Sequence, residues 1–282
     1  METPRKKTTS MTERLEVSPA VALIENLGNL MMRRMTIAGR ATLLFIDAVS
    51  YAPLFRRSWR TIIRQLEVSG FGSLMVLSLI AGLTGMIMAV QIGTALKQFG
   101  AEREIGEIIG ATFTREMGPI WAAVIILARI GSSMAAELGT MVVNEEVDAL
   151  RAMSINPVRF LVMPRILALV LAMPILTAVA DWIGMLGGAF AAKLTFGTSM
   201  HIFMSSAQEG LDGMDFFSGL CKSVVFACII GTISCDRGPN TSDGAEGVGR
   251  ATTEAVVYSS ITILISNFFL TLTLNRLFHL YD

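Results

Sequence analysis

The amino-acid sequence predicts an all-α integral membrane protein with five transmembrane helices. An N-terminal interfacial amphipathic helix precedes them, and a short cytoplasmic helix lies between the second and third spans. Apolar residues make up 52% of the 282 residues and charged residues 16%, below the roughly 25% charged content of a soluble domain. Several uncharged runs approach the roughly 20 residues that cross a bilayer as helix. Lysine and arginine are also clustered, as in the cytoplasmic parts of membrane proteins.

The N-terminal part precedes the first predicted span. Residues 1–30 are polar and charged, do not resemble a signal peptide, and are expected to be cytoplasmic. Within 31–66, the apolar stretch from Ala41 to Phe55 is too short to cross a membrane and is flanked by arginines. These features predict a helix in the inner interface, with arginines reaching anionic headgroups. A helix packed on the bundle is the alternative.

Five spans follow, at about 68–96, 105–136, 166–192, 216–235 and 253–275. Val68–Leu96 and Ala255–Asn275 contain no charged residue. The third span is interrupted only by Asp181 and the fourth by Lys222, whereas the second carries several charges. Eleven of the 23 lysines and arginines precede residue 65, and others flank residues 139–157 or follow the fourth span. The N-terminus is therefore expected in the cytoplasm and the C-terminus on the other side.

The segment GTMVVNEEVDALRAMSINP, residues 139–157, gathers four charges between two apolar spans. Asn144 is the expected N-cap, acidic residues favour the first turn, and Asn156-Pro157 ends the helix. The pattern predicts an amphipathic cytoplasmic helix at about 139–155. Two interpretations remain open, a solvated loop face or a docking surface for a cytoplasmic partner. The charged residues are Glu145, Glu146, Asp148 and Arg151.

Charged residues inside the predicted spans are costly unless they face a partner or a water-filled cavity. Arg115 and Glu116 lie in the second span. Arg115 together with Lys222 would suit a phosphate or carboxylate headgroup, which arginine can grip bidentately. The alternative is a structural ion pair, for example Asp181 with Lys222.

Several other kinds of site find little support in the sequence. There is no GxxxxGK[ST] phosphate loop and no catalytic triad pattern, so the chain is expected not to be an enzyme. Zero net charge gives no support for nucleic-acid binding. The three cysteines are seven residues apart, which favours packing over a metal or disulfide. No cofactor or metal is expected. Small-residue pairs, Gly106 with Gly110 and Gly184 with Gly188, predict close helix packing.

One long region resembles a known family. Residues 113–165 read FTREMGPIWAAVIILARIGSSMAAELGTMVVNEEVDALRAMSINPVRFLVMPR. They resemble the signature region of the MlaE family of ABC transporter permeases, which runs through RELGP, GRxGS, AELGTM and EQIDAL to NPxRxLVxPR. LCKSVVFACIIGTISC (220–235) and GAEGVGRATTEAVVYSS (244–260) are also similar to the family.

The resemblance implies a permease domain over residues 67–282 that forms a homodimer in the bacterial inner membrane. It implies two copies of an ABC ATPase, which bind ATP and Mg, an MCE-domain periplasmic substrate-binding protein, and often a STAS-domain protein. The expected substrate is phospholipid or a related hydrophobic molecule. By position, Arg115, Glu116 and Lys222 would line the lipid pocket. The 139–155 helix would be a coupling helix that contacts the ATPase through Glu137, Glu145, Glu146, Asp148 and Arg151.

Two other classes remain as alternatives. An ion-coupled secondary transporter could use Asp181 and Glu116 as relay carboxylates, and would need an ion gradient and no ATPase. In a membrane scaffold, neutralisation of Arg115 or Lys222 would change only the stability of the protein. Asp181 itself is expected to serve packing or an ion pair within the bundle.

Overall fold

The computed structural model describes residues 36, 39–51, 55–241 and 244–278. The chain divides into two compact units, residues 1–41 and 42–282, and the five spanning helices belong to the second unit. The predicted 1–30 segment and part of the 31–66 region lie outside the described residues. Across the described ranges the regular elements are all helical, which confirms the all-α prediction.

Five helical stretches among the described residues are long and apolar enough to cross a membrane, as predicted. The first belongs to α2 (Phe55–Lys97), which begins well before its apolar part. Residues 55–66, which the sequence placed with the interfacial region, are therefore the first turns of the first spanning helix. The five stretches are Gly72–Lys97, Glu102–Val143, Val158–Phe196, Gly213–Arg237 and Gly244–Leu277.

The second span is built from three α-helices joined by two π-helical turns. The turns, Phe113–Met117 and Leu127–Gly131, carry Arg115 and Arg129 respectively. In its most apolar part 56% of the residues are buried, against 17% in the fifth span, although Arg115 and Arg129 themselves are exposed. Single π-helical turns are frequent at functional sites. The α-helices are α3 (Ile105–Thr112), α4 (Gly118–Ile126) and α5 (Ser132–Val143).

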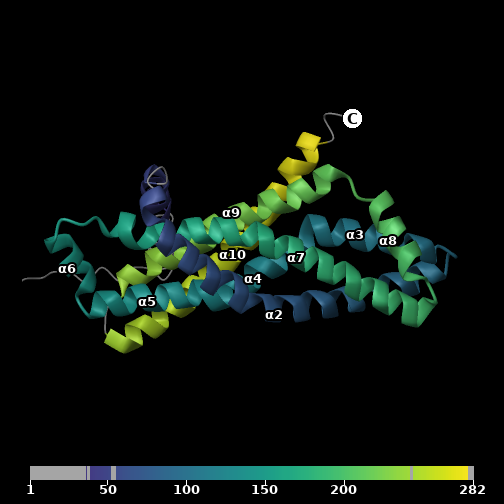
Figure 1. Cartoon of the computed structure of the whole chain (residues 1–282), viewed down its shortest axis with the longest axis horizontal. Helices are drawn as coiled ribbons and strands as arrows, with labels where there is room; N and C mark the ends of the chain where they lie inside the picture. Colours follow the sequence, from purple (N-terminus) through teal and green to yellow (C-terminus); the bar gives the residue numbers. More distant parts are fainter. Residues whose placement is uncertain (1–35, 37–38, 52–54, 242–243, 279–282) are drawn as a thin grey trace, which may run out of the picture. The chain divides into compact units, whose positions relative to one another are not determined.

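The remaining helices define two ends of this unit (Figure 1). At one end α6 (Glu146–Ala152) follows α5, and we call this the α6 end. At the other, the α8 end, α8 (Met200–Glu209) links α7 (Met163–Phe196) to α9. Sequence patterns did not predict α8, whose start is capped by the Ser199 hydroxyl. The last helices are α9 (Gly213–Arg237) and α10 (Gly244–Phe278).

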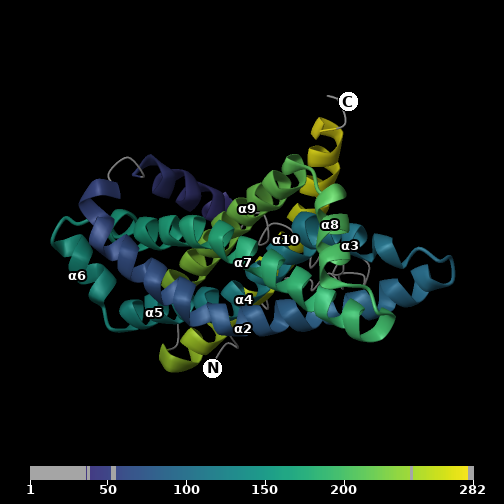
Figure 2. The same ribbon diagram turned by 45° about the vertical axis from the view of Figure 1, so that its right-hand side comes forward.

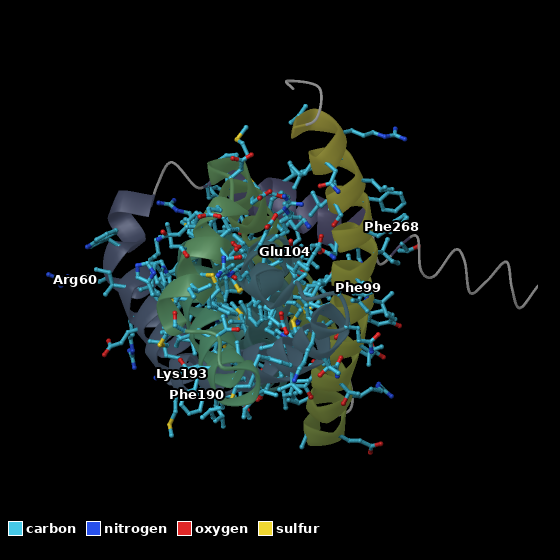
Figure 3. All side chains as sticks on the ribbon, turned by 90° about the vertical axis from the view of Figure 1, so that its right-hand side faces the viewer. Arg60, Phe99, Glu104, Phe190, Lys193 and Phe268 are labelled. Atoms are coloured by element: carbon cyan, nitrogen blue, oxygen red, sulfur yellow. The ribbon has the colours of Figure 1, made fainter. Side chains whose placement is uncertain are left out.

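Glycines allow these helices to pack closely. α2 runs along α7 in both views (Figures 1 and 2), and a Cβ on Gly85 would collide with the backbone carbonyl of Gly184. A Cβ on Gly106 would likewise collide with the backbone of Phe203 in α8. The small-residue pairs therefore lie where helix backbones touch, as the sequence predicted. By contrast, the outer face of α10, including Phe268, points away from the other helices (Figure 3).

The short helix before α2, predicted to lie in the interface or to pack on the bundle, has two different faces. Within residues 42–50, Leu44 and Ala48 pack against the main apolar core. Leu43, Ile46 and Val49 are exposed. One face of this helix therefore packs on the bundle, and the other offers apolar side chains to the surroundings.

Candidate functional site

A buried lysine lies at the centre of the candidate site. Lys222, in α9, is 1% exposed, and an ammonium group has three N–H donors. Its Nζ donates to the backbone carbonyl of Arg115 at 2.9 Å, to Glu116 Oε1 at 2.7 Å and to Thr271 Oγ1 at 2.8 Å. All three donors are therefore satisfied within the protein, as a buried charge requires.

The sequence around Arg115 explains why its carbonyl is available. In an α-helix this carbonyl would accept from the N–H of the residue four positions later, which is Pro119 and has no N–H. The backbone N–H of Gly118 instead donates to the carbonyl of Phe113, in the wider π-helical pattern. The carbonyl of Arg115 is thus left for Lys222, which bridges the second and fourth spans.

Glu116 extends this cluster to the fifth span. Its Oε1 accepts from Lys222 and from Thr271 Oγ1 at 2.8 Å. Its Oε2 accepts from Asn267 Nδ2 at 2.9 Å. Asn267 and Thr271 are four residues apart, so they share one face of α10. Glu116 is consequently held by donors from α9 and α10.

Arg115 turns the other way, toward the start of α9. Its Nε and Nη2 donate to the two carboxylate oxygens of Asp215 at 2.6 and 2.9 Å. Asp215 also accepts from the backbone N–H of Asp212 in the capping box that begins α9. About half of the Arg115 side chain is exposed, so this pair lies at the accessible edge of the cluster.

We refer to Arg115, Glu116, Asp215 and Lys222 as the charge cluster. It contains two cations and two carboxylates, so its formal net charge is zero. It joins the second and fourth spans directly, and reaches the fifth through Asn267 and Thr271, near the α8 end. The structure therefore brings together the three residues predicted for a lipid pocket, but it supplies both cations with carboxylate partners from this chain.

The predicted ion pair of Asp181 is not formed with any described residue. Asp181 is 2% exposed, and its Oδ1 lies against Gly118 without a hydrogen-bond partner in the described part of the chain. Lys222, the partner considered from the sequence, has its three donors committed elsewhere. The absence of a side chain at Gly118 provides the space for this carboxylate.

The acidic segment at the α6 end is shorter than predicted. Gly139–Val143 belong to α5, and Asn144 is the C-cap of α5 rather than the N-cap of the next helix. α6 covers only Glu146–Ala152, and two left-handed residues frame it, Glu145 with φ 58° and Ser154 with φ 59°. Such conformations cost about 1–2 kcal/mol in non-glycine residues. Asn156, predicted to end this helix, instead accepts from Val158 N–H at the start of the next span.

The charges predicted for α6 are all at the surface. Glu145, Glu146, Asp148 and Arg151 are exposed, whereas Val147 is buried and holds the helix to the protein. Asp148 and Arg151 form an ion pair at 2.8 Å. Glu137 and Glu146 line one open hollow of about 370 Å³ beside α5. The structure thus places an acidic surface at this end.

Glu137 also makes a contact that the sequence did not predict. Its Oε2 accepts from Arg165 Nη2 at 2.8 Å, and its Oε1 from the hydroxyl of Ser133 at 3.0 Å. Arg165 is buried, at 5% exposed. The pair ties α5 to the start of α7, so Glu137 serves a structural contact as well as lining the hollow.

Sequence reasoning missed four polar partners, and three of them had a local signal. Asn267 and Thr271 form an i, i+4 polar pair in an otherwise apolar span. Asp215 is the last residue of a D-x-x-D capping pattern after a glycine-rich turn. The involvement of Arg165 with Glu137 had no such signal, because the two residues are far apart in sequence. The described residues contain no group of three or more potential metal ligands, and all three cysteines are free thiols.

Comparisons with known proteins agree with this architecture. The family model for permease MlaE matches residues 62–273. A probable ABC transporter permease of Rickettsia prowazekii is 44% identical over 210 residues, covering 74% of this chain and 81% of that protein. A probable ABC transporter permease of Synechocystis is 40% identical over 211 residues, covering 75% and 80%.

A plant protein is also similar. The chloroplastic protein trigalactosyldiacylglycerol 1 of Arabidopsis thaliana is 40% identical over 212 residues, which cover 75% of this chain and 61% of that protein. The region that the family model matches, residues 62–273, runs from the first span into the fifth and includes both the charge cluster and α6. On the family model and these identities together, the chain belongs to the MlaE family of permeases.

Proposed function

We propose that this chain is the membrane-spanning subunit of an ABC transporter that moves phospholipid, or a related amphiphile, between the inner and outer membranes of a bacterium. The observation that carries the proposal is the family match over residues 62–273. The name of the Arabidopsis relative refers to a galactolipid, which favours a lipid over a small polar solute. ATP hydrolysis then belongs to a partner chain.

We further propose that the α6 end faces the cytoplasm and the α8 end the periplasm. The first turns of α2, with Arg60 and Arg64, lie beside the connection from α6 to α7, and Arg151, Arg159 and Arg165 also belong to the α6 end. The N-terminus would then be cytoplasmic, and the C-terminus periplasmic. An MCE-domain protein would meet the α8 end, and a STAS-domain protein would act on the cytoplasmic side.

Arg115 is the residue best placed to recognise a lipid headgroup. Its guanidinium is half exposed and is held by the two oxygens of Asp215. A phosphate offers the same pair of acceptor oxygens, so a headgroup could replace Asp215 without leaving the cation unpaired. Lys222 and Glu116 would then position Arg115 through its backbone and the π-helical turn, rather than contact the phosphate themselves.

The acidic surface at the α6 end is the proposed contact for two copies of the ATPase on a homodimer of this chain. Its acids are exposed, and Glu137 and Glu146 share one hollow. A basic surface on the ATPase would complement them. Closure of the ATPases on ATP would move α6, and that motion would reach the charge cluster through the second span, which ends directly before α6.

The test is to purify the tagged full chain from its native membrane in mild detergent and to identify what accompanies it. Protein mass spectrometry is expected to find an ATPase with a phosphate-binding loop, and lipid mass spectrometry to find phospholipid above the level in empty detergent. An unrelated five-span protein from the same membrane, prepared in the same way, is the control.

Two results would overturn the proposal. A folded preparation without ATPase and without phospholipid would contradict it, and transport that needs an ion gradient but no ATPase would favour a secondary transporter. Glu116 gives that rival little support, because Lys222, Asn267 and Thr271 already donate to its oxygens.

A further inference from the structure

A second cavity lies at the α6 end, far along the spans from the charge cluster. Its volume is about 630 Å³, within the range of about 300–1,000 Å³ of small-molecule pockets. Its walls come from three places, the end of the short helix before α2, the early turns of α2, and the connection from α6 to α7. Residues from these places include Tyr51, Gln65, Asn156, Arg159 and Arg165.

The cavity has the charge of an anion site. Arg159 and Arg165 line it, and none of its described lining residues is an aspartate or glutamate. Arg159, partly exposed in the π-helical turn Val158–Val162, forms no ion pair with a described residue. Arg165 is paired with Glu137, so the local balance is one positive charge.

Arg165 provides the strongest indication of a ligand. It is 5% exposed, and only its Nη2 has a hydrogen-bond acceptor. Its Nε and Nη1 are buried without a partner among the described residues. These atoms carry three N–H donors, and leaving them unsatisfied in a buried place is costly. Both atoms are closed to solvent, so the guanidinium must turn toward the cavity that Arg165 lines before a phosphate oxygen there can accept from them and relieve that cost.

Neutral polar groups complete the walls. Asn156 Nδ2 donates to Tyr51 Oη at 3.1 Å, and Asn156 Oδ1 accepts from the backbone N–H of Val158 at 2.9 Å. Tyr51 accepts in this contact, which leaves its phenolic proton available as a donor. Asn156 and Tyr51 therefore hold each other in place at the mouth of the third span.

The surroundings favour a lipid as the source of the anion. Ile155 and Phe160 line the cavity and are exposed, Phe160 at 58%. On α2 nearby, Trp59 and Ile63 are exposed apolar side chains and Arg60 and Arg64 are exposed cations. Exposed tryptophan beside arginine is typical of the level where headgroups meet acyl chains. Arg60 projects outward in Figure 3.

From these observations we propose that the cavity binds the phosphate of an anionic phospholipid of the adjoining leaflet, with Arg159 and Arg165 on the phosphate and the acyl chains passing Phe160. This site is separate from the one proposed at Arg115, and it does not depend on the transport function. Ser154, Ile155 and Asn156 directly follow α6. A bound headgroup would therefore brace the connection between α6 and α7.

Hydrogen-exchange mass spectrometry on the purified full chain in detergent tests this proposal, because it locates binding as well as detecting it. Phosphatidylglycerol, diacylglycerol and inorganic phosphate are added in separate titrations. Phosphatidylglycerol is expected to slow exchange in residues 154–166, and the other two compounds are not. The charge cluster lies on other peptides, so lipid binding there does not interfere with the readout.

Variants identify the groups responsible. Arg159→Gln is expected to raise the phosphatidylglycerol concentration for half-maximal protection about tenfold, the usual cost of losing a charge-assisted hydrogen bond. Tyr51→Phe preserves volume and should raise this concentration about threefold, because it removes the phenolic donor to the phosphate and the acceptor of Asn156 Nδ2. Arg276→Gln removes an exposed arginine in the last turn of α10, outside the cavity lining, and should leave the titration unchanged. Arg165 is not substituted, because it also holds Glu137.

Three results would overturn the proposal. The first is unchanged binding in both Arg159→Gln and Tyr51→Phe. Equal protection by diacylglycerol would show that the phosphate is not recognised. Equal protection by inorganic phosphate at the same concentration would show a site for a soluble anion rather than a lipid. If Arg159→Gln does not fold, the phosphatidylglycerol titration of Tyr51→Phe tests the proposal alone, and unchanged binding in that variant overturns it.

Discussion

The charge cluster and the charges of α6 contain the same kinds of residue in opposite surroundings. In the cluster, the Lys222 side chain is 2% exposed and donates to three acceptors. On α6, the Asp148 side chain is 70% exposed and its partner Arg151 is 65% exposed. The buried Lys222 is satisfied by its own chain, whereas an exposed charge is satisfied by water and remains available to a partner. Burial therefore separates the charges that hold the bundle from those that can bind another protein.

Substitution of Lys222 by methionine should have the largest effect on stability. Methionine keeps much of the volume but leaves Glu116 without its cation, and breaking a buried pair from one side costs about 3 kcal/mol or more. The free energy of unfolding, measured by denaturant titration in detergent, should fall by that amount. The transition temperature of the purified chain should fall with it.

The double variant Lys222→Met with Glu116→Gln is the control for that prediction. It removes both charges, so no carboxylate is left buried alone, and most of the lost stability should return. A double variant less stable than Lys222→Met would show that Glu116 has support independent of Lys222. Burial of the Lys222–Glu116 pair would then not account for the stability of the charge cluster.

The exposure of Arg115 lies between that of Lys222 and that of the α6 charges. Its substitution by glutamine should therefore lower the free energy of unfolding by less than the Lys222 substitution does. Half of its side chain is exposed, and Asp215 keeps the N–H of Asp212 as a donor, so we expect a loss of about 1 kcal/mol. Phospholipid retained per purified chain should also fall, as measured by lipid mass spectrometry. Arg115→Lys preserves the charge but not the bidentate hydrogen-bond geometry. This variant should retain an amount of phospholipid between those of the wild type and Arg115→Gln. Equal retention in all three forms would exclude Arg115 as a headgroup ligand.

The five spans could be predicted because the length and hydropathy of an apolar segment are enough to identify a membrane-spanning helix. Val68–Leu96 and Ala255–Asn275 contain no charge, and both lie within spanning helices of the structure. The start of α2 at Phe55 could not be predicted, because its first turns are rich in arginine and resemble a surface segment. α8 was missed because ten residues beside a glycine turn give too short a periodic pattern.

The sequence predicted which charged residues belong to the candidate site, but not which of them pair with each other. Arg115, Glu116 and Lys222 stood out because charges are rare in spans, and the structure brings them together. Which carboxylate faces Lys222 depends on helix rotation, which hydropathy does not determine. The sequence suggested Asp181 as an example of a partner for Lys222, whereas the structure pairs Lys222 with Glu116. The π-helical turn before Pro119 leaves the carbonyl of Arg115 to Lys222, which brings the ammonium group beside Glu116.

Reversal of Glu145 and Glu146 to lysine should leave stability within about 0.5 kcal/mol, because both side chains are exposed and away from the core. Association with the ATPase should weaken about tenfold or more, since like charges would then face each other. Co-purification and a binding titration with the isolated ATPase measure this. The matched control is reversal of Glu102 and Glu104, at the α8 end. Unchanged association in the α6 variant would contradict the docking role.

The smallest effect is expected for Asp148→Asn, which breaks the ion pair with Arg151 at 2.8 Å. Both groups are well exposed, and such pairs contribute about 0.2–1 kcal/mol, near the lower limit for neighbours on one helix. Asp148 also lies in the first turn of α6, where a negative charge adds a few tenths of a kcal/mol. We therefore expect a loss of about 0.5 kcal/mol at low salt, vanishing at about 1 M salt because screening then acts within about 3 Å. A loss above about 1 kcal/mol that persists in high salt would mean that α6 is held by its charges, as the cluster is, and that exposure does not separate the two regions.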